Sequence, residues 1–216
     1  YSKTYSTINT KTPSTYLDVS LGKLKGLNVH ILGFVNSPGV YALHPFSDPF
    51  TALFYAGGID TTGSLRDIQI YRDGIKINTV DIYNIIFGGP IDKQIRLLDQ
   101  DIIFVPPRKS KVIINGAVQI PSYFELKIDE TALDLVNYAG GLTSKASSRA
   151  ILKRINSPFK RKNDDQAIDH FSIPLDSLKY FKISNGDSLY LGFISEYYPT
   201  VTINGQVKRP GQYPFI

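Results

Sequence analysis

The sequence of 216 residues contains no cysteine and no long apolar segment, and each absence excludes a class of structure. Without cysteine the chain can form no disulfide, no thiolate nucleophile and no cysteine-ligated zinc site, while the redox compartment stays open. No segment approaches the ~18 consecutive apolar residues of a membrane span, and no charged-then-apolar leader opens the chain. The chain begins in a polar stretch and ends within a strand pattern. We therefore expect an excised piece of a longer protein, in which a missing leader says nothing about secretion.

Histidine is scarce as well. His30, His44 and His170 lie in separate segments without the spacing of metal ligands, so we predict no metal and no cofactor. The net charge of +5 is a mild basic excess that does not by itself indicate a polyanionic partner, and we expect no nucleic-acid binding. With 42% hydrophobic residues the chain can bury a core, and its length fits one large domain or two small ones.

What the sequence does contain is an internal repeat. The segments "ILGFVNSPGVY" (31–41), "INGAVQIPSYF" (114–124) and "INGQVKRPGQY" (203–213) align without gaps. A second motif, Ala-Gly-Gly, occurs at 56–58 and 139–141, and both motifs recur at an offset of 83 residues. One offset shared by two separate motifs argues against chance. The glycines and prolines of these motifs are Gly33, Pro38, Gly39, Gly57, Gly58, Gly116, Pro121, Gly140, Gly141, Gly205, Pro210 and Gly211.

A closing strand completes each copy. "LLDQDIIFVP" (97–106) matches "ISNGDSLYLG" (183–192), with Asp101 opposite Asp187. Asp99 and Asp101 could be imagined as the paired carboxylates of a glycosidase. The same positions precede the strand in both copies, however, and a turn-forming role fits both. We therefore predict no catalytic residue.

Each copy predicts a hairpin, one helix and further strands. Hairpins are expected at 28–43 and 111–126, because β-branched and apolar residues flank a proline-containing turn. After the helix, "IQIYRDGIKINTV" (68–80) predicts two strands joined by a two-residue Asp-Gly turn, which copy two replaces with a polar excursion at 156–168. Short helical turns are expected before the closing strands, at 81–89 and 174–181.

The helix signals are capping residues at both ends. In copy one we predict Ser47 or Asp48 as N-cap ahead of Pro49, and in copy two Asp129. Gly57 and Gly140 follow the helices, where a left-handed residue suits glycine. A glycine pair after a helix indicates a C-cap, because phosphate-binding loops place glycines before a helix. The predicted buried faces are Phe50, Leu53 and Ala56 in copy one and Leu133, Val136 and Ala139 in copy two.

This succession of motifs resembles the soluble-ligand-binding β-grasp (SLBB) domain. The motifs are Gly-x-Val-x-x-Pro-Gly-x-Tyr, a helix ending in Ala-Gly-Gly, and a closing strand introduced by aspartate. SLBB domains are abundant in outer-membrane polysaccharide export (Wza-like) proteins. The resemblance covers about 29–106 and 112–194. Copy two departs from the pattern at Ser122, where glycine is expected, and at Leu191-Gly192, which replaces Val-Pro; these departures bear on turn geometry.

The resemblance implies an α+β fold of tandem β-grasp (ubiquitin-like) domains, each with a mixed sheet and one main helix. We expect a lead-in at 1–27, domains at 28–107 and 108–196, and the first hairpin of a truncated third domain at 197–216. This last hairpin should either pack on the second domain or fray. No export signature domain lies within the chain.

A few residues are candidates for contacts with glycan or partner. Lys160, Arg161 and Lys162 lie together in a charged stretch, although a solvated loop tip is the commoner explanation for such a stretch. Tyr55 and Tyr138 share a helix position and could stack on sugars, or pack under the sheet. Lys208 and Arg209 are expected at a hairpin tip where copy one has Asn36 and Ser37, and such charge differences would select which faces mate.

The resemblance implies a non-enzymatic, periplasmic segment of an outer-membrane polysaccharide export channel in the cell envelope of a Gram-negative bacterium. The implied partners are polysaccharide, further copies of the chain in a homo-oligomeric ring, and an inner-membrane polysaccharide co-polymerase. Two alternatives stay open. One is a periplasmic carbohydrate-binding module whose repeats hold glycan, and the other is a carbohydrate-processing enzyme.

Overall fold

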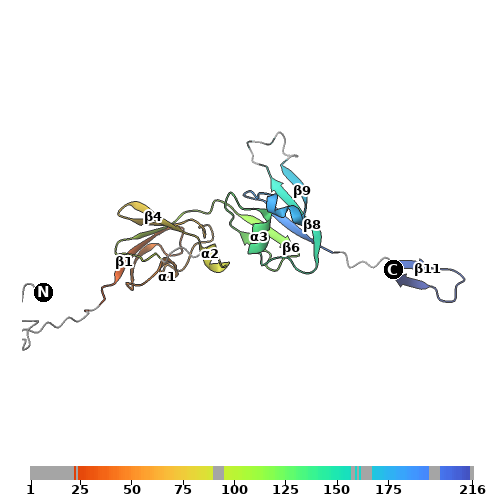
Figure 1. Ribbon diagram of the computed structural model, residues 1–216, viewed down its shortest axis with the longest axis horizontal. Coiled ribbons are helices and arrows are strands. Elements are labelled where there is room, and N and C mark those ends of the chain that lie inside the picture. Colours follow the sequence, from red (N-terminus) through yellow and green to blue (C-terminus); the bar gives the residue numbers. More distant parts are fainter. Residues whose placement is uncertain are drawn as a thin grey trace, which may run out of the picture.

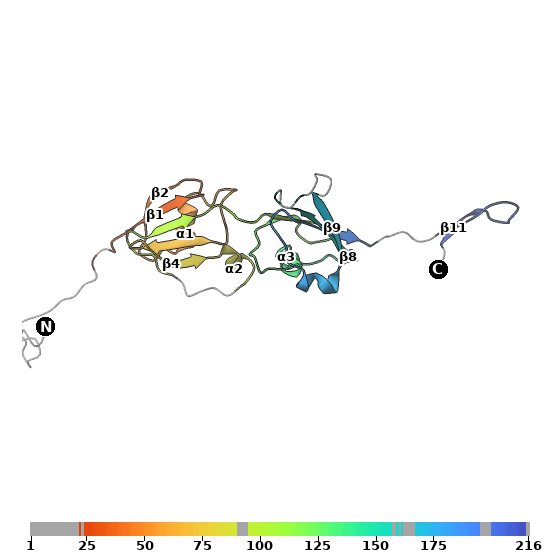
Figure 2. The same ribbon diagram turned by 90° about the horizontal axis from the view of Figure 1, so that it is seen from above.

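The computed structural model describes residues 22, 24–89, 95–156, 159, 161, 167–194 and 200–214. Two repeats lie side by side along the long axis of the molecule (Figures 1 and 2). Repeat 1 consists of β1 (Leu27–Gly33), β2 (Gly39–Leu43), α1 (Pro49–Tyr55), β3 (Ile68–Arg72), β4 (Ile75–Val80), α2 (Ile82–Ile86) and β5 (Ile102–Val105). Repeat 2 consists of β6 (Val112–Gly116), β7 (Ser122–Phe124), α3 (Ala132–Tyr138), β8 (Ala146–Ile155), β9 (Ile168–Pro174), the 3-10 helix η3 (Leu175–Tyr180) and β10 (Ser188–Phe193).

The two repeats share one sheet topology. Repeat 1 has the strand order β2-β1-β5-β3-β4 and repeat 2 the order β7-β6-β10-β8-β9. In each, the first and last strands pair in parallel and the other neighbours are antiparallel. Each repeat is thus a mixed five-stranded sheet with one main helix, and the predicted α+β class is confirmed. Within the described residues, no helix is long and apolar enough to cross a membrane.

The main helices follow their predicted capping only in part. Asp48 caps α1 and accepts a hydrogen bond from Thr51 N at 2.7 Å, as predicted. For α3 the prediction of Asp129 is wrong: the N-cap is Thr131, which forms a capping box with Asp134. The capping box satisfies two backbone donors at once, and a residue two positions earlier cannot do this.

The buried helix faces are also partly different from the prediction. Phe50 and Leu133 point to solvent, with exposed fractions of 51% and 37%. Each helix instead buries residues at positions i, i+3, i+4 and i+7, which form one continuous stripe. These residues are Pro49, Ala52, Leu53 and Ala56 in repeat 1 and Ala132, Leu135, Val136 and Ala139 in repeat 2.

Both helices end in the same glycine-dependent motif. Gly57 and Gly140 have φ values of 76° and 77°, the left-handed conformation predicted for them. In α1, Gly57 N donates to Phe54 O and Gly58 N to Leu53 O, and α3 repeats both bonds. This pair of bonds is a Schellman motif, which satisfies the last carbonyls of the helix.

A second pair of glycines is required where the parallel strands meet. Gly33 and Gly116 have φ values of 88° and 91°. A Cβ at these positions would lie 2.2 Å from Val105 O and 1.9 Å from Leu191 O. No side chain fits at such a distance, so these motif glycines are fixed by the approach of the closing strand. The motif prolines Pro38, Pro121 and Pro210 each directly precede a strand, namely β2, β7 and β12 (Gly211–Pro214).

The aspartates before the closing strands shape turns, as predicted, and each also pairs with an arginine. Asp101 is fully buried; it accepts from Leu98 N and forms a two-pronged ion pair with Arg72. Asp187 repeats this arrangement with Ser184 N and Arg154. The Asp73-Gly74 turn is formed as predicted, with φ values of 50° and 76°.

The last described strands form a separate two-stranded hairpin, β11 (Thr200–Ile203) and β12. Every residue of β11 is exposed. The apolar residues Val201, Ile203, Val207 and Tyr213 have exposed fractions between 39% and 46%. The hairpin thus keeps its strand pairing, while its apolar side chains remain open to solvent.

Candidate functional site

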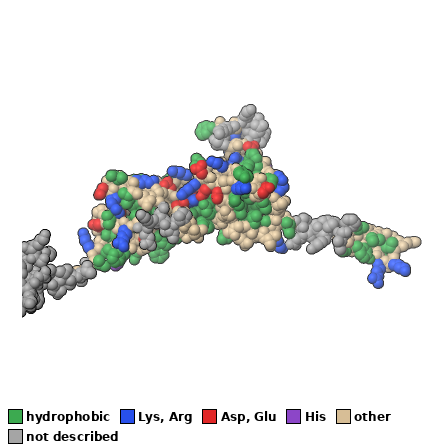
Figure 3. Space-filling model, in the orientation of Figure 1, with side chains coloured by type: hydrophobic (Ala, Val, Ile, Leu, Met, Phe, Trp, Pro, Cys, Tyr) green, Lys and Arg blue, Asp and Glu red, His purple; other side chains and the backbone are tan. Residues whose placement is uncertain are grey.

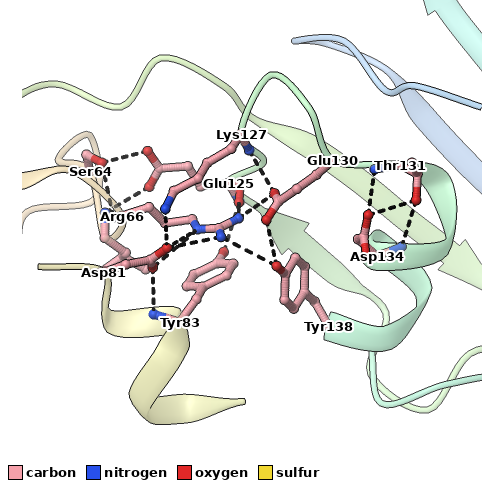
Figure 4. A network of polar contacts seen from close by, with 11 residues as sticks. Ser64, Arg66, Asp81, Tyr83, Glu125, Lys127, Glu130, Thr131, Asp134 and Tyr138 are labelled. Atoms are coloured by element: carbon pink, nitrogen blue, oxygen red, sulfur yellow. Dashed lines mark hydrogen bonds and ion pairs between the residues drawn. The ribbon is translucent and has the colours of Figure 1, made fainter. Parts of the chain in front are cut away.

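The most elaborate polar cluster lies where the two repeats meet. Side chains of both charges gather at this junction on the molecular surface (Figure 3). Repeat 1 contributes the loop before β3 and the helix α2, which lies on the side of repeat 1 that faces repeat 2 (Figures 1 and 2). Repeat 2 contributes the segment between β7 and α3 and the last residue of α3 (Figure 4).

Arg66 is the centre of the junction and is only 5% exposed. Within repeat 1 its Nε and Nη2 donate to the Asp81 carboxylate at 3.1 to 3.3 Å. Toward repeat 2, Nη1 donates to Glu125 O at 3.1 Å and to Glu130 Oε2 at 2.5 Å. One planar guanidinium therefore ties both repeats together, a task for which its fixed fork of donors is suited.

Two further side chains of repeat 2 reach back to repeat 1. The Glu125 carboxylate accepts hydrogen bonds from Ser64 Oγ at 2.6 Å and from Leu65 N at 2.8 Å. Lys127 Nζ lies 2.7 Å from Asp81 Oδ2. With Arg66, these groups form a network across the junction (Figure 4). The carboxylates of Asp81, Glu125 and Glu130 each have a donor from the opposite repeat.

An aromatic layer lies under the ionic network. The Arg66 guanidinium lies 4.4 Å from the ring centroid of Tyr83 and 5.2 Å from that of Tyr138. Tyr83 and Phe87 of repeat 1 contact Tyr138 of repeat 2, with ring centroids 5.1 and 5.0 Å apart. Tyr83 is 6% exposed and belongs to the core of repeat 2, although it comes from a helix of repeat 1. The hydrophobic cores are therefore in contact through the junction.

The connection between the repeats is held against repeat 1. Ser64 N donates to Pro106 O at 2.9 Å and Arg108 N to Thr62 O at 2.8 Å. Pro107 forms an isolated bridge with Gly63. These bonds fix the backbone of the connecting segment, so it does not act as a free linker.

The electrostatics of the junction favour the charged forms of Asp81 and Arg66. Burial alone would raise the pKa of Asp81, but the hydrogen bonds from Arg66 and Lys127 outweigh burial and lower it. Burial opposes the charge of Arg66, yet hydrogen bonds to Glu130 and Asp81 raise its pKa. Burial and the hydrogen bond to Glu130 raise the pKa of Tyr138 to about 12. Asp81 and Arg66 are therefore ionised at neutral pH, and Tyr138 is neutral.

This arrangement is suited to mechanical fixation. The carboxylates are engaged by cations or backbone donors, and the tyrosine hydroxyls by neighbouring polar groups. Removing one member of a buried ion pair strands its partner, at a cost of about 3–5 kcal/mol. Among the described residues, no group of three or more histidine, cysteine, aspartate or glutamate side chains could hold a metal ion.

The residues predicted to contact glycan or a partner lie in different environments. Tyr138 lies in the junction, where its hydroxyl donates to Glu130 Oε1 at 2.7 Å, so it packs between repeats. Tyr55 occupies the matching position of repeat 1 and is 61% exposed. Arg161 donates from Nε to Asn156 O at 2.9 Å, whereas Lys160 and Lys162 lie outside the described residues. Lys208 and Arg209 lie between β11 and β12 and are exposed.

Apart from Tyr138, the residues of the junction were not predicted. A Ser-x-Arg segment occurs once in each copy, at 64–66 and 147–149, so Arg66 has a counterpart in Arg149, which is exposed. Glu125 and Glu130 occur where copy one has Ala42 and Ser47. The available sequence signal for the junction was therefore a charged residue, such as Glu125 or Glu130, at a position that is neutral in the other copy. The repeat alignment alone does not tell which copy makes the contact.

Fold and junction together define a tandem β-grasp protein with a fixed joint. The family model of the SLBB domain matches residues 28–78 and 111–162. The chain therefore contains two SLBB domains, one in each repeat. SLBB domains are periplasmic ligand-binding domains that occur in polysaccharide export proteins, and they are associated with binding and transport rather than with catalysis. A comparison with curated proteins gives no significant match.

Proposed function

We propose that this chain is a structural periplasmic segment of an outer-membrane protein that exports capsule or exopolysaccharide. In this role the two SLBB domains form a rigid stretch in the wall of an oligomeric conduit. The observation that carries the proposal is the junction around Arg66, which joins the repeats through the Arg66–Glu130 and Lys127–Asp81 ion pairs and a shared aromatic layer. A conduit wall must keep its shape, whereas independent binding modules need no such joint.

The domain boundaries belong to the same proposal. Residues 1–27 are a lead-in, 28–107 and 108–196 are the two domains, and 197–216 begin a third. The third unit is supported by its exposed apolar side chains. In repeat 2 the positions that match Val201, Ile203, Val207 and Tyr213 are all buried, namely Val112, Ile114, Val118 and Phe124. A hairpin with the core residues of this fold requires a further apolar surface to complete a core.

The proposed partners are polysaccharide, further copies of the chain in a ring, and an inner-membrane polysaccharide co-polymerase. The tip of the last hairpin presents Lys208 and Arg209. The matching position Asn36 instead donates to Gly57 O of its own helix end. In the full-length exporter we expect reversal of both tip charges to glutamate to abolish the oligomer in size-exclusion chromatography with light scattering. An unchanged oligomer would count against this use of the tip.

The export role is tested in a bacterium that produces the polymer. Deletion of the gene should abolish surface polysaccharide while the polymer is still synthesised. Complementation with Arg66→Ala should restore protein but not export, whereas Lys76→Ala, an exposed change on β4, should restore both. Normal surface polysaccharide in the deletion strain would overturn the proposal.

A further inference from the structure

The sheet of repeat 2 has one open face. The helix α3 lies against the opposite face of the sheet, where the core residues are buried (Figure 1). On the open face, β8 presents Arg149, Ile151 and Lys153, and β10 presents Tyr190 next to Ile151. Because successive residues of a strand point to opposite faces, these side chains share one surface. The surface extends over four neighbouring strands, about 14 Å across at ~4.8 Å per strand.

This open face combines aromatic rings with cations. Tyr123 on β7 is 57% exposed, and Lys111 Nζ lies 4.2 Å from its ring centroid. Tyr190 is 44% exposed. Arg149 is held in place because Nε donates to Ser172 Oγ at 2.8 Å and Nη2 to Ser172 O at 2.9 Å. We call Lys111, Tyr123, Arg149, Ile151, Lys153 and Tyr190 the basic sheet face.

The charge on this face has a single sign. None of the described strand residues that point outward from the sheet of repeat 2 is acidic. Asp169 on β9 is paired in register with Arg154 and so points to the other face. An anionic ligand would therefore meet cations here without a neighbouring carboxylate to repel it.

The fold does not require this surface. In repeat 1, the position of Lys111 is Asn28, that of Tyr123 is Val40 and that of Lys153 is Tyr71. The same sheet forms with those residues, with the same strand order. Lys111, Lys153 and the exposed Tyr123 are therefore an added property of repeat 2.

We propose that the basic sheet face binds an anionic polysaccharide, one that carries carboxylates on its sugar rings. The tyrosine rings offer flat apolar surfaces with a polar edge for the C–H faces of pyranose rings. Arg149 and Lys153 pair with the carboxylates, in charge-assisted contacts that are stronger than neutral hydrogen bonds. The assignment rests on the proposed function, which supplies polysaccharide as the ligand class, and adds to it the surface and the charge of the polymer.

The test is calorimetric titration of the purified chain with hexamers of galacturonate and, as the neutral probe, maltohexaose. We expect the galacturonate hexamer to bind and the double variant Arg149→Gln, Lys153→Gln to lose at least tenfold in affinity. Tyr190→Ala should also weaken binding. Lys76→Gln on β4 of repeat 1 removes the same charge elsewhere and should leave the affinity unchanged. Thermal unfolding of each variant verifies that the fold is retained.

Three results would overturn the inference. These are no binding of the galacturonate hexamer, equal binding of maltohexaose, and an equal loss in Lys76→Gln. None of them affects the export role, which the surface polysaccharide of the deletion strain tests separately. Conversely, galacturonate binding to this face together with normal surface polysaccharide in the deletion strain would support the binding site and contradict the conduit role.

Discussion

At the scale of single residues, Arg66 has no substitute. It is the only one of the two "Ser-x-Arg" arginines that is buried, and it bonds Asp81 in its own repeat and Glu130 in the other. We predict that Arg66→Ala lowers the free energy of unfolding by about 3–5 kcal/mol, because Glu130 loses its ion-pair partner and Asp81 loses one of its two cations. Urea denaturation measures the change. The exposed Arg149→Ala is the matched control and should cost less than about 1 kcal/mol; equal losses would contradict the role of Arg66.

The lowered pKa of Asp81 predicts an acid-sensitive junction. A carboxylate whose pKa is lower in the folded than in the unfolded state stabilises the fold above its unfolded pKa, which is near 3.8. This contribution is lost as the pH falls below 3.8 through the folded pKa. We therefore expect Asp81→Asn to flatten the fall in stability over that acid range, measured by thermal unfolding from pH 5 downward. The same acid-dependent loss in wild type and variant would contradict it.

At the scale of elements, most of the fold was predictable from sequence because the determinants are local. The glycines, the Asp73-Gly74 turn and Asp48 act on neighbouring backbone, and the duplicated spacing doubled each signal. The errors lay where two local solutions competed. Thr131 rather than Asp129 is the N-cap of α3, because Asp134 completes its capping box. The buried stripe of α1 begins at Pro49 and does not include Phe50.

The motif glycines are required for two different reasons, positive φ and the close approach of a neighbouring strand. A pair of substitutions distinguishes these reasons. Gly116 and Gly141 both have positive φ, at 91° and 89°, but only Gly116 faces Leu191 O, while Gly141 has open space. We predict that Gly141→Ala costs about 1–2 kcal/mol from conformation alone. Gly116→Ala should cost clearly more, because β6 and β10 must separate. Equal losses in chemical denaturation would contradict the steric account.

At the scale of the whole molecule, the sequence marks single residues of the junction but does not show which residues pair across it. Arg66 and Glu130 lie 64 residues apart, and nothing local to either one indicates the other. Tyr138 was placed correctly on a helix next to Ala-Gly-Gly, but its partners Tyr83 and Phe87 come from the other repeat. Contacts between repeats depend on how the units stack, and a repeat alignment carries no information on this.

The shared aromatic layer also predicts that the two repeats unfold together. Tyr83 lies in the core of repeat 2, so unfolding of either repeat exposes apolar surface of the other. We expect one transition for residues of both repeats in native-state hydrogen exchange with urea. In Arg66→Ala the two sets of amides should separate into two transitions. Separate transitions in the wild type would indicate that the cores are independent.

The central claim is that the two repeats form one rigid body through the junction. Residual dipolar couplings of the weakly aligned, labelled chain test it most directly, because they yield one alignment tensor for each repeat. A rigid junction predicts tensors that agree in magnitude and orientation in the wild type and diverge in Arg66→Ala. Tensors that already differ between the repeats of the wild type would contradict the account.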